Sequence, residues 1–397
     1  MGFPARMNKD DLLKYLEPFV ADLERQGSLQ SQWLKDALLR VPRHLFIDRY
    51  YEPEPVPHFV AVDPQCPTEQ QLAAIYSDRG LMIREPPNHS AASQPSLVID
   101  MLEALEVARG QKVLEVGTGS GWNAALLAFG VGDDRLVYSI DIQPDLIEPA
   151  RQHLSAAGFP NVNLTAADGG YGWLEAAPFD RIIVTASSGD IPPAWIEQLA
   201  DGGVLVLPLK TAGIGDPVLR LRKDGQRVAG QFTRWCYFVP LVGAFLNGEQ
   251  EGLLPPWEPF IEELRRREPT KVPIAESVDR DCVFLAYLTT GLVRGTQPLR
   301  VRPGPLPGSY AADLAVFDPQ SRSICVALSE EPAVEVYGDL GGAERLAITQ
   351  QEWIALGRPK ITDYKVELVD PARAAEEHGV WIDRRPHATL KFSLPTR

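Results

Sequence analysis

The stretch Lys112-Val-Leu-Glu-Val-Gly-Thr-Gly-Ser-Gly-Trp122 decides the fold of this chain. It begins with apolar residues that favour a β-strand and continues into three glycines at alternate positions. The apolar segment 124–127 follows and predicts a helix. A strand, a glycine turn and a helix start bring backbone N–H groups close to a ligand. Glycine allows close approach, and the first turn of a helix has free N–H groups.

The spacing of the glycines separates two kinds of nucleotide-binding turn. A dinucleotide fingerprint has the form G-x-G-x-x-G, whereas this chain has G-x-G-x-G, with Trp122 where the fingerprint needs its last glycine. An acid, Glu115, lies in the expected strand two residues before Gly117. This E-x-G-x-G-x-G pattern resembles motif I of S-adenosylmethionine-dependent methyltransferases. A different nucleotide binder, or a glycine turn without a ligand, is the alternative.

Strands and helices alternate from this stretch onward, which predicts an α/β fold with a doubly wound, mostly parallel sheet and helices on both faces. Strands are expected at 112–116, 135–140, 163–166, 180–185 and 203–209, and helices up to 129 and at 144–157 and 193–200. Asp141 and Asp168 follow the second and third strands, at the sheet edge where ligands of such folds bind. Asp141 is suited to accept both ribose hydroxyls, and Asp168 the adenine amino group. A helix N-cap or a solvated turn is the structural alternative for each acid.

The composition of the chain predicts four parts. Residues 1–92 predict a helical cap within 8–46 and a proline-rich loop at 52–68, and residues 93–245 carry the alternating elements. A hairpin of 217–222 and 231–239 is expected to finish the sheet, and 246–275 predict a linker helix. Residues 276–397 predict a small α+β domain that folds on its own and recognises a peptide. Its strands are expected at 283–288, 314–318, 324–328 and 364–370, and its helix at 343–356.

Composition also limits the function classes. The 397-residue chain has a net charge of -14, which argues against a general binder of nucleic acid or of anionic membranes. Its four cysteines form no C-x-x-C pair and its six histidines have no metal-ligand spacing, so we expect no metal. The N-terminus lacks the apolar core of a signal peptide, and the longest apolar run, 236–246, is too short to span a bilayer. We therefore expect a cytoplasmic protein.

Several further segments, in order along the chain, together resemble protein-L-isoaspartate O-methyltransferases. They are VPRHLF at 41–46, SQP at 93–95, VLEVGTGSGW at 113–122, DGGYGW at 168–173 and FDRIIVTASSGDIP at 179–192. The resemblance covers roughly residues 8 to 245. It implies that the chain binds S-adenosylmethionine and releases S-adenosylhomocysteine.

The resemblance also implies positions for cofactor and substrate. The implied cofactor residues are Glu115, Gly117, Thr118, Gly119, Gly121, Asp141, Ile142, Asp168 and Gly169. Ser93 would orient an acceptor carboxylate near the methyl group, and the implied substrate-binding residues are Ala92, Gln94, Ala186 and Ser187. A carboxylate has a pKa near 4 and is ionised at pH 7, so this reaction needs no general base. As the structural alternative, Ser93 is the N-cap of a helix that begins near Pro95.

Two departures from the family pattern point to a subgroup. Ala91 and Ala92 replace the usual Thr-Ile pair, and residues 276–397 follow the shared part. These features resemble enzymes that methylate an aspartate of a modified precursor peptide in lanthipeptide, lasso or graspetide maturation, where the ester collapses to a succinimide. The alternatives are general repair of isoaspartyl peptides, methylation of RNA or a small molecule, and a non-catalytic peptide-binding scaffold.

Overall fold

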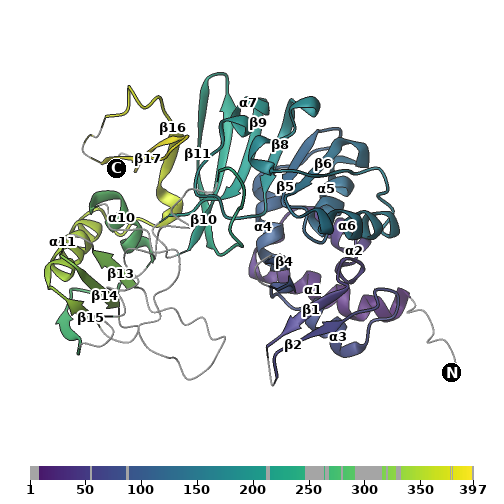
Figure 1. Cartoon of the computed structure of the whole chain (residues 1–397), viewed down its shortest axis with the longest axis horizontal. Helices are drawn as coiled ribbons and strands as arrows, with labels where there is room; N and C mark the ends of the chain where they lie inside the picture. Colours follow the sequence, from purple (N-terminus) through teal and green to yellow (C-terminus); the bar gives the residue numbers. More distant parts are fainter. Residues whose placement is uncertain are drawn as a thin grey trace.

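The computed structural model describes residues 9–53, 56–85, 89–211, 215–245, 263, 268–278, 280–290, 315–318, 321–327, 332–375, 377 and 379–395. Ten strands of this described part form one sheet (Figure 1). In spatial order they are β17 (Val380–Arg384), β18 (Thr389–Ser393), β16 (Lys365–Leu368), β11 (Arg227–Cys236), β10 (Asp216–Asp224), β9 (Leu199–Pro208), β8 (Phe179–Val184), β5 (Val113–Val116), β6 (Val137–Asp141) and β7 (Asn163–Ala166). Neighbours from β9 to β7 are parallel, and those from β9 to β17 are antiparallel. The predicted α/β fold is confirmed.

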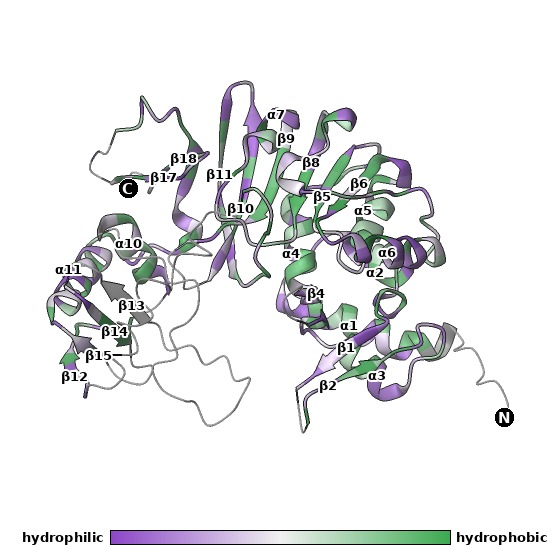
Figure 2. Cartoon of the chain, viewed as in Figure 1, coloured by the Kyte–Doolittle hydropathy of each residue, from purple (hydrophilic) through white to green (hydrophobic). Residues whose placement is uncertain are grey.

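Both faces of the sheet are covered by helices, as predicted. Along β9, Val204 and Val206 join one hydrophobic cluster while Leu205 and Leu207 join another, because successive strand residues point to opposite faces. The first cluster is completed by α1 (Lys9–Gln26), α2 (Gln32–Arg40), α4 (Pro95–Leu105), α5 (Trp122–Val131) and α6 (Pro144–Ala156). The second is completed by α7 (Pro193–Gln198), α10 (Arg280–Thr290) and α11 (Gly341–Ala355). Figure 2 shows β8 and β9 in the centre of the sheet as predominantly hydrophobic, whereas β11 carries much of the hydrophilic colour.

The N-terminal part is helical, as predicted, but the loop expected at 52–68 is partly strand. After α1, α2 and the short helix η1 (Arg43–Phe46), β1 (Arg49–Glu52) pairs with β2 (His58–Ala61). No proline lies inside either strand, so the prolines punctuate a hairpin rather than prevent one. Next come α3 (Glu69–Ile75) and a second hairpin of β3 (Leu81–Arg84) and β4 (Ser90–Ala92), which leads directly into Ser93.

The residues after 275 extend the sheet, so the prediction that the hairpin of β10 and β11 finishes it is wrong. β16 pairs with β11, and β18 and β17 follow. A second sheet has the order β12 (Thr270–Pro273), β15 (Ala333–Gly338), β14 (Ser323–Ala327) and β13 (Ala315–Asp318). Residues 283–288, expected as a strand, lie in helix α10, because a short apolar run does not distinguish a buried strand from a buried helix. Most of the predicted linker helix falls outside the described residues.

This C-terminal extension shares its hydrophobic core with the sheet. The ring of Phe232 on β11 lies 5.8 Å from that of Phe284 on α10 and 6.1 Å from that of Phe392 on β18. All three side chains are fully buried in the second cluster, together with residues of β8 and β9. The sheet and the C-terminal extension therefore share one hydrophobic core, although the sequence predicted a linker between two separate domains.

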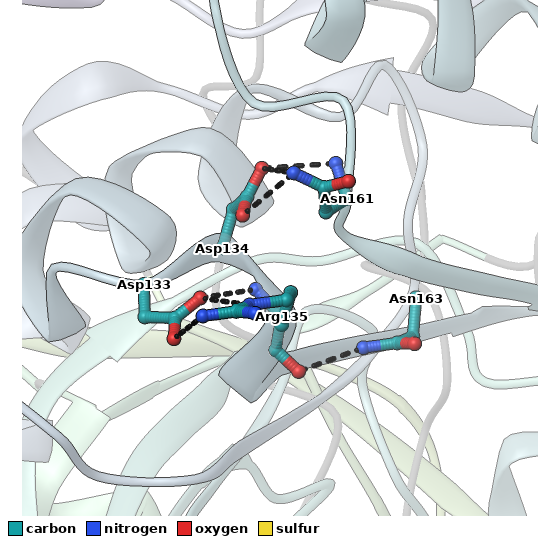
Figure 3. A network of polar contacts seen from close by, with 5 residues as sticks. All are labelled: Asp133, Asp134, Arg135, Asn161 and Asn163. Atoms are coloured by element: carbon teal, nitrogen blue, oxygen red, sulfur yellow. Dashed lines mark hydrogen bonds and ion pairs between the residues drawn. The ribbon is translucent and has the colours of Figure 1, made fainter.

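An acidic turn before β6 fastens β7 to its neighbour (Figure 3). Asp134 accepts the backbone N–H of Asn161 at 2.9 Å, and Asp133 holds the guanidinium of Arg135. Asn163 donates to the carbonyl of Arg135 at 2.9 Å. Each acid therefore has partners of its own, at the amino ends of the strands, opposite the edge where ligands of such folds bind.

The described part of the chain contains neither a membrane-spanning helix nor a cluster of metal ligands. No helix there is long and apolar enough to cross a membrane. No three His, Cys, Asp or Glu side chains there lie close enough to share a metal ion.

Candidate functional site

A cavity of about 590 Å³ opens at the carboxyl ends of β5, β6 and β8. Its walls come from the glycine turn, from the loop 89–93, and from the segment 238–242 after β11. Nine predicted site residues line it: Ala92, Ser93, Gly117, Thr118, Gly119, Asp141, Ile142, Gly169 and Ala186. Five do not line it: Gln94, Glu115, Gly121, Asp168 and Ser187. Most of the predicted site residues therefore lie at the cavity, and the other five have a different place in the structure.

The glycine turn forms the floor of the cavity. Gly117 has a φ of +102° and Gly119 a φ of +51°, in the left-handed region that side chains disfavour. A Cβ at Gly117 would collide with the hydroxyl of Thr185, which donates to the Gly117 carbonyl at 2.7 Å. Gly121 instead faces α6, where a Cβ would meet Ala150 at 3.4 Å. Two glycines therefore open the floor, and the third lets α5 start against α6.

Asp141 presents a carboxylate to the cavity from the end of β6. Its side chain accepts the N–H of Gly119 at 2.9 Å and the N–H of Gln143 at 3.0 Å. Asp141 is 8 % exposed, and burial raises the pKa of its carboxyl. It makes no ion pair with any described residue, and each oxygen keeps a lone pair for another donor. This arrangement suits hydroxyl donors such as those of a ribose.

Two more acceptors in the cavity wall await a donor. The side-chain oxygens of Asn123 and Gln143 are buried without a hydrogen-bond partner within the described residues, and both residues line the cavity. Buried polar atoms are normally paired, so these oxygens indicate a bound ligand with N–H or O–H groups. S-adenosylmethionine carries such groups on its amino acid, ribose and adenine parts. The residues present therefore fit this cofactor.

Glu115 lies behind the cavity rather than in its wall. It is fully buried and accepts from the amide of Asn123 at 2.7 Å and from the hydroxyl of Ser139 at 2.5 Å. Burial raises the pKa of this carboxyl to about 7, although both hydrogen bonds oppose the shift. Glu115 thus positions Asn123 and does not reach a ligand itself, contrary to the sequence prediction.

Replacing Glu115 with glutamine should flatten the dependence of stability on pH. Between its ordinary pKa of 4.5 and its folded pKa of about 7, the folded protein keeps a proton that the unfolded chain has lost. The free energy of unfolding therefore falls as pH rises through this window, by up to about 3 kcal/mol. Thermal melts at pH 5 to 8 should show the variant losing less stability than the wild type. Parallel curves for the two proteins would contradict this assignment.

Asp168 also has its partners elsewhere. Its carboxylate accepts the N–H of Gly170 at 2.9 Å and the N–H of Ala244 at 2.6 Å. It precedes the short helix η3 (Gly169–Tyr171), of which Gly169 does line the cavity. The structural alternative of a cap therefore describes Asp168, and the cavity receives the backbone of Gly169 rather than the carboxylate.

Ser93 is free of the capping role that the sequence offered as its alternative. The N-cap of α4 is Gln94, and the carboxylate of Asp78 accepts the N–H of Ser96 at 2.8 Å. The amide of Gln94 also donates to Asp78, at 3.1 Å, which turns this side chain away from the cavity. The hydroxyl of Ser93 has no hydrogen-bond partner in the described part of the chain and lines the cavity. It is available to a ligand.

Arg43 is a site residue that sequence reasoning missed. Its guanidinium, fully buried, donates to the carbonyls of Ile75 at 2.6 Å, Ala92 at 3.1 Å and Ser93 at 2.8 Å. It also lies 5.4 Å from the ring centre of Trp122. Burial lowers the pKa of this guanidinium to about 10. The VPR segment, interpreted as a packed cap, therefore holds the loop that carries Ser93.

The loop after β8 contributes Ala186 to the cavity wall. The backbone of Ser187 in the same loop is hydrogen-bonded to the segment 238–242 instead. The N–H of Ser187 donates to Val239 at 2.8 Å, and its carbonyl accepts from Leu241 at 2.8 Å. These bonds hold the segment 238–242 as a wall of the cavity. The strand predicted at 231–239 accordingly ends at Cys236, and the residues beyond it belong to the site.

Comparison with known proteins covers the same part of the chain. The family model described as "Protein-L-isoaspartate(D-aspartate) O-methyltransferase (PCMT)" matches residues 15–245. A protein-L-isoaspartate O-methyltransferase of Pyrococcus abyssi is 34% identical over 236 residues, which are 59% of this chain and 98% of that protein. Its counterpart in Geobacter metallireducens is 40% identical over 225 residues, 56% of this chain and 91% of that protein.

A likeness in fold reaches further than these sequence matches. A solved structure named protein-L-isoaspartate O-methyltransferase aligns with a TM-score of 0.53 and 23% identity, covering 88% of this chain and 95% of its own. Residues 15–245 cannot supply a share of 88%, so the alignment extends past residue 245. A fold that continues past the shared part therefore also occurs in a solved structure of that name, whereas the sequence analysis took residues 276–397 as a departure from the family pattern.

Proposed function

The chain belongs to the protein-L-isoaspartate(D-aspartate) O-methyltransferase family, and from this premise we propose that it methylates the free carboxylate of L-isoaspartyl residues in peptides and proteins. It is an S-adenosylmethionine-dependent carboxyl methyltransferase. The observation that carries the proposal is the shared cavity: Ser93, whose hydroxyl has no partner in the described part of the chain, and Asp141 both line it. Asp141, Asn123 and Gln143 would hold the cofactor, and Ser93 the acceptor.

The residues of the cavity perform positioning rather than proton transfer. S-adenosylmethionine supplies an electrophilic methyl group, and the acceptor carboxylate is already ionised at pH 7. Ser93 has its hydroxyl free to donate to that carboxylate, and Arg43 fixes the backbone that carries it. Val98, Met101 and Ile183 also line the cavity, and their apolar side chains would exclude water from the acceptor oxygen. Alignment and desolvation would then supply the rate.

General repair of isoaspartyl residues is the better supported substrate range. The two relatives described above are protein-L-isoaspartate O-methyltransferases that align over almost their whole length. A role in tailoring one modified precursor peptide, as the sequence features suggested, has no support from these relatives.

The test compares two peptides that differ in one linkage. A linear peptide with an L-isoaspartyl residue and the same sequence with an ordinary aspartyl residue are incubated with the enzyme and S-adenosylmethionine. Mass spectrometry should show a methyl ester on the isoaspartyl peptide, followed by loss of methanol as the succinimide forms. The preference should be roughly tenfold or more in kcat/KM. Methylation of an aspartyl residue in a macrocyclic peptide, without methylation of the linear isoaspartyl peptide, would overturn the repair function.

The Ser93→Ala variant should lower kcat/KM for the isoaspartyl peptide by about 10- to 100-fold, the value of one hydrogen bond to a charged group. Its free energy of unfolding should stay within about 0.5 kcal/mol of the wild type, because the hydroxyl has no partner in the described structure. A variant that keeps full turnover would remove Ser93 from the acceptor site.

A further inference from the structure

The turn between β17 and β18, residues 385–388 of the extension, contacts two segments next to the cavity: the loop 186–191, which supplies Ala186 to the wall, and Phe245. Arg385 in this turn has a fully buried side chain. It donates to the carbonyl of Gly189 at 2.8 Å and to that of Lys210 at 3.0 Å. Its charge is balanced by Asp383 at 2.8 Å, which also accepts from Tyr287 of α10. The turn is thus anchored in the extension and reaches the loop 186–191 after β8.

His387 continues this contact through a buried carboxylate. Asp190 is 0 % exposed and accepts the backbone N–H of His387 at 2.7 Å. It also lies 3.0 Å from Nδ1 of the same ring. Because a carboxylate only accepts, Nδ1 carries the proton in this contact, whatever the charge of the ring. The other oxygen of Asp190 accepts the N–H of Ile191 at 2.8 Å. The extension therefore supplies two of the three donors that fix Asp190.

The same histidine also packs against Phe245, which lies next to the turn at 168–170. Its ring lies 5.0 Å from the ring of Phe245. Phe245 covers Gly170, where a Cβ would collide with the phenyl ring, and stacks edge-on against Tyr171 at 5.2 Å. Gly169, the neighbour of Gly170, lines the cavity. His387 therefore contacts Asp190 in the loop 186–191 on one side and Phe245, which covers the turn at 168–170, on the other.

We propose that His387 is a positioning residue for the acceptor, which sets the loop 186–191 through Asp190 and so fixes the wall that Ala186 forms. The proposal rests on the function proposed above and assigns the extension a part in the acceptor site. Only three residues separate Ala186 from Asp190, and the pairing of Ser187 with 239 and 241 transmits a shift of this loop to the wall 238–242.

Kinetics of His387→Ala and His387→Asn test this proposal in the full chain. His387→Ala should raise KM for a linear isoaspartyl peptide about five- to tenfold, with kcat and the Kd for S-adenosylmethionine within about twofold. His387→Asn should restore KM, because its amide N–H can replace the Nδ1–H donor. The matched control is Arg384→Ala, which removes hydrogen bonds to the carbonyls of Pro371 and Ala374 next to the same turn and should keep the wild-type KM.

Hydrogen exchange separates a failure of this proposal from a failure of the proposed function. Amides 186–191 should exchange faster in His387→Ala than in the wild type or in Arg384→Ala, whatever the enzyme methylates. Unchanged exchange there, or a lowered melting temperature without a rise in KM, would overturn the positioning role. A wild type that is inactive on isoaspartyl peptides, with faster exchange in the variant, would overturn the repair function and keep the link between His387 and the loop.

Discussion

Replacing Asp141 with alanine is expected to weaken S-adenosylmethionine binding by about 10²- to 10⁴-fold. Two hydrogen bonds from ribose hydroxyls to a carboxylate in a largely buried site contribute about 1.5–3 kcal/mol each. The variant also releases the N–H groups of Gly119 and Gln143, which the carboxylate holds at 2.9 and 3.0 Å. On the proposed function, Asp141 would therefore act on the cofactor both directly and through the shape of the turn. Titration calorimetry on the purified variant measures the change.

Asp133→Ala is the matched control for this experiment. It removes the same charge and lies just before the same strand, β6, but at the amino end and in contact with Arg135 (Figure 3). Its affinity for the cofactor should equal that of the wild type. If Asp141→Ala binds as tightly as Asp133→Ala, Asp141 does not hold the cofactor.

The sequence predicted the strands and helices around the cavity well, because the patterns that mark them lie within short stretches of the chain. The glycine spacing and the strand–helix alternation located β5, β6, β7 and the edge where the cavity opens. Asp141 could be chosen because it ends a strand, and the structure places its carboxylate in the cavity wall. Asp168 and Glu115 carry the same kind of local signal. Their carboxylates are occupied by Ala244 and by Ser139, partners far away in the sequence.

The sequence left open what long-range packing decides. Ser93 lies two residues before a proline, so the acceptor role predicted for it and the alternative of a helix cap could not be separated until the structure placed Asp78 on the N–H of Ser96. Arg43 has no charged neighbour in sequence that marks it, and its four carbonyl partners include Ala92 and Ser93, about 50 residues later. Such contacts follow from the fold and are not encoded in a short pattern.

Removal of the C-terminal extension is expected to have the second large effect, a loss of folding. Because the sequence predicts that residues 276–397 fold as a separate domain, a chain ended at residue 272 would be expected to stay folded and to bind the cofactor. The structure predicts instead that this shortened chain fails to fold. Loss of β16 leaves Val228–Gln231 of β11 as an open edge, which favours aggregation. Loss of α10 and β18 exposes Phe232, and burial of one such side chain contributes about 1.5–3 kcal/mol.

Polar losses add to this apolar exposure. Without Arg385 the carbonyls of Gly189 and Lys210 lose a charged donor, and without His387 the buried Asp190 loses two. These losses remove native hydrogen bonds, two of them from a buried guanidinium, in addition to the apolar surface that becomes exposed. The truncation therefore removes part of a core, not an appended domain.

Size-exclusion chromatography and circular dichroism of the truncated chain, beside the full chain, measure the outcome. We expect aggregates or a chain without a cooperative thermal transition, and no binding of S-adenosylmethionine by calorimetry. The full chain with Arg384→Ala should elute like the wild type and fold cooperatively, since that side chain is exposed and bonds to the carbonyls of Pro371 and Ala374. A truncated chain that is monomeric, melts cooperatively and binds the cofactor with wild-type affinity would show that the contacts of Phe232 and Asp190 with the extension have little energetic weight. The sheet would then be complete at β11, and the positioning of the loop 186–191 would have to come from the methyltransferase part alone.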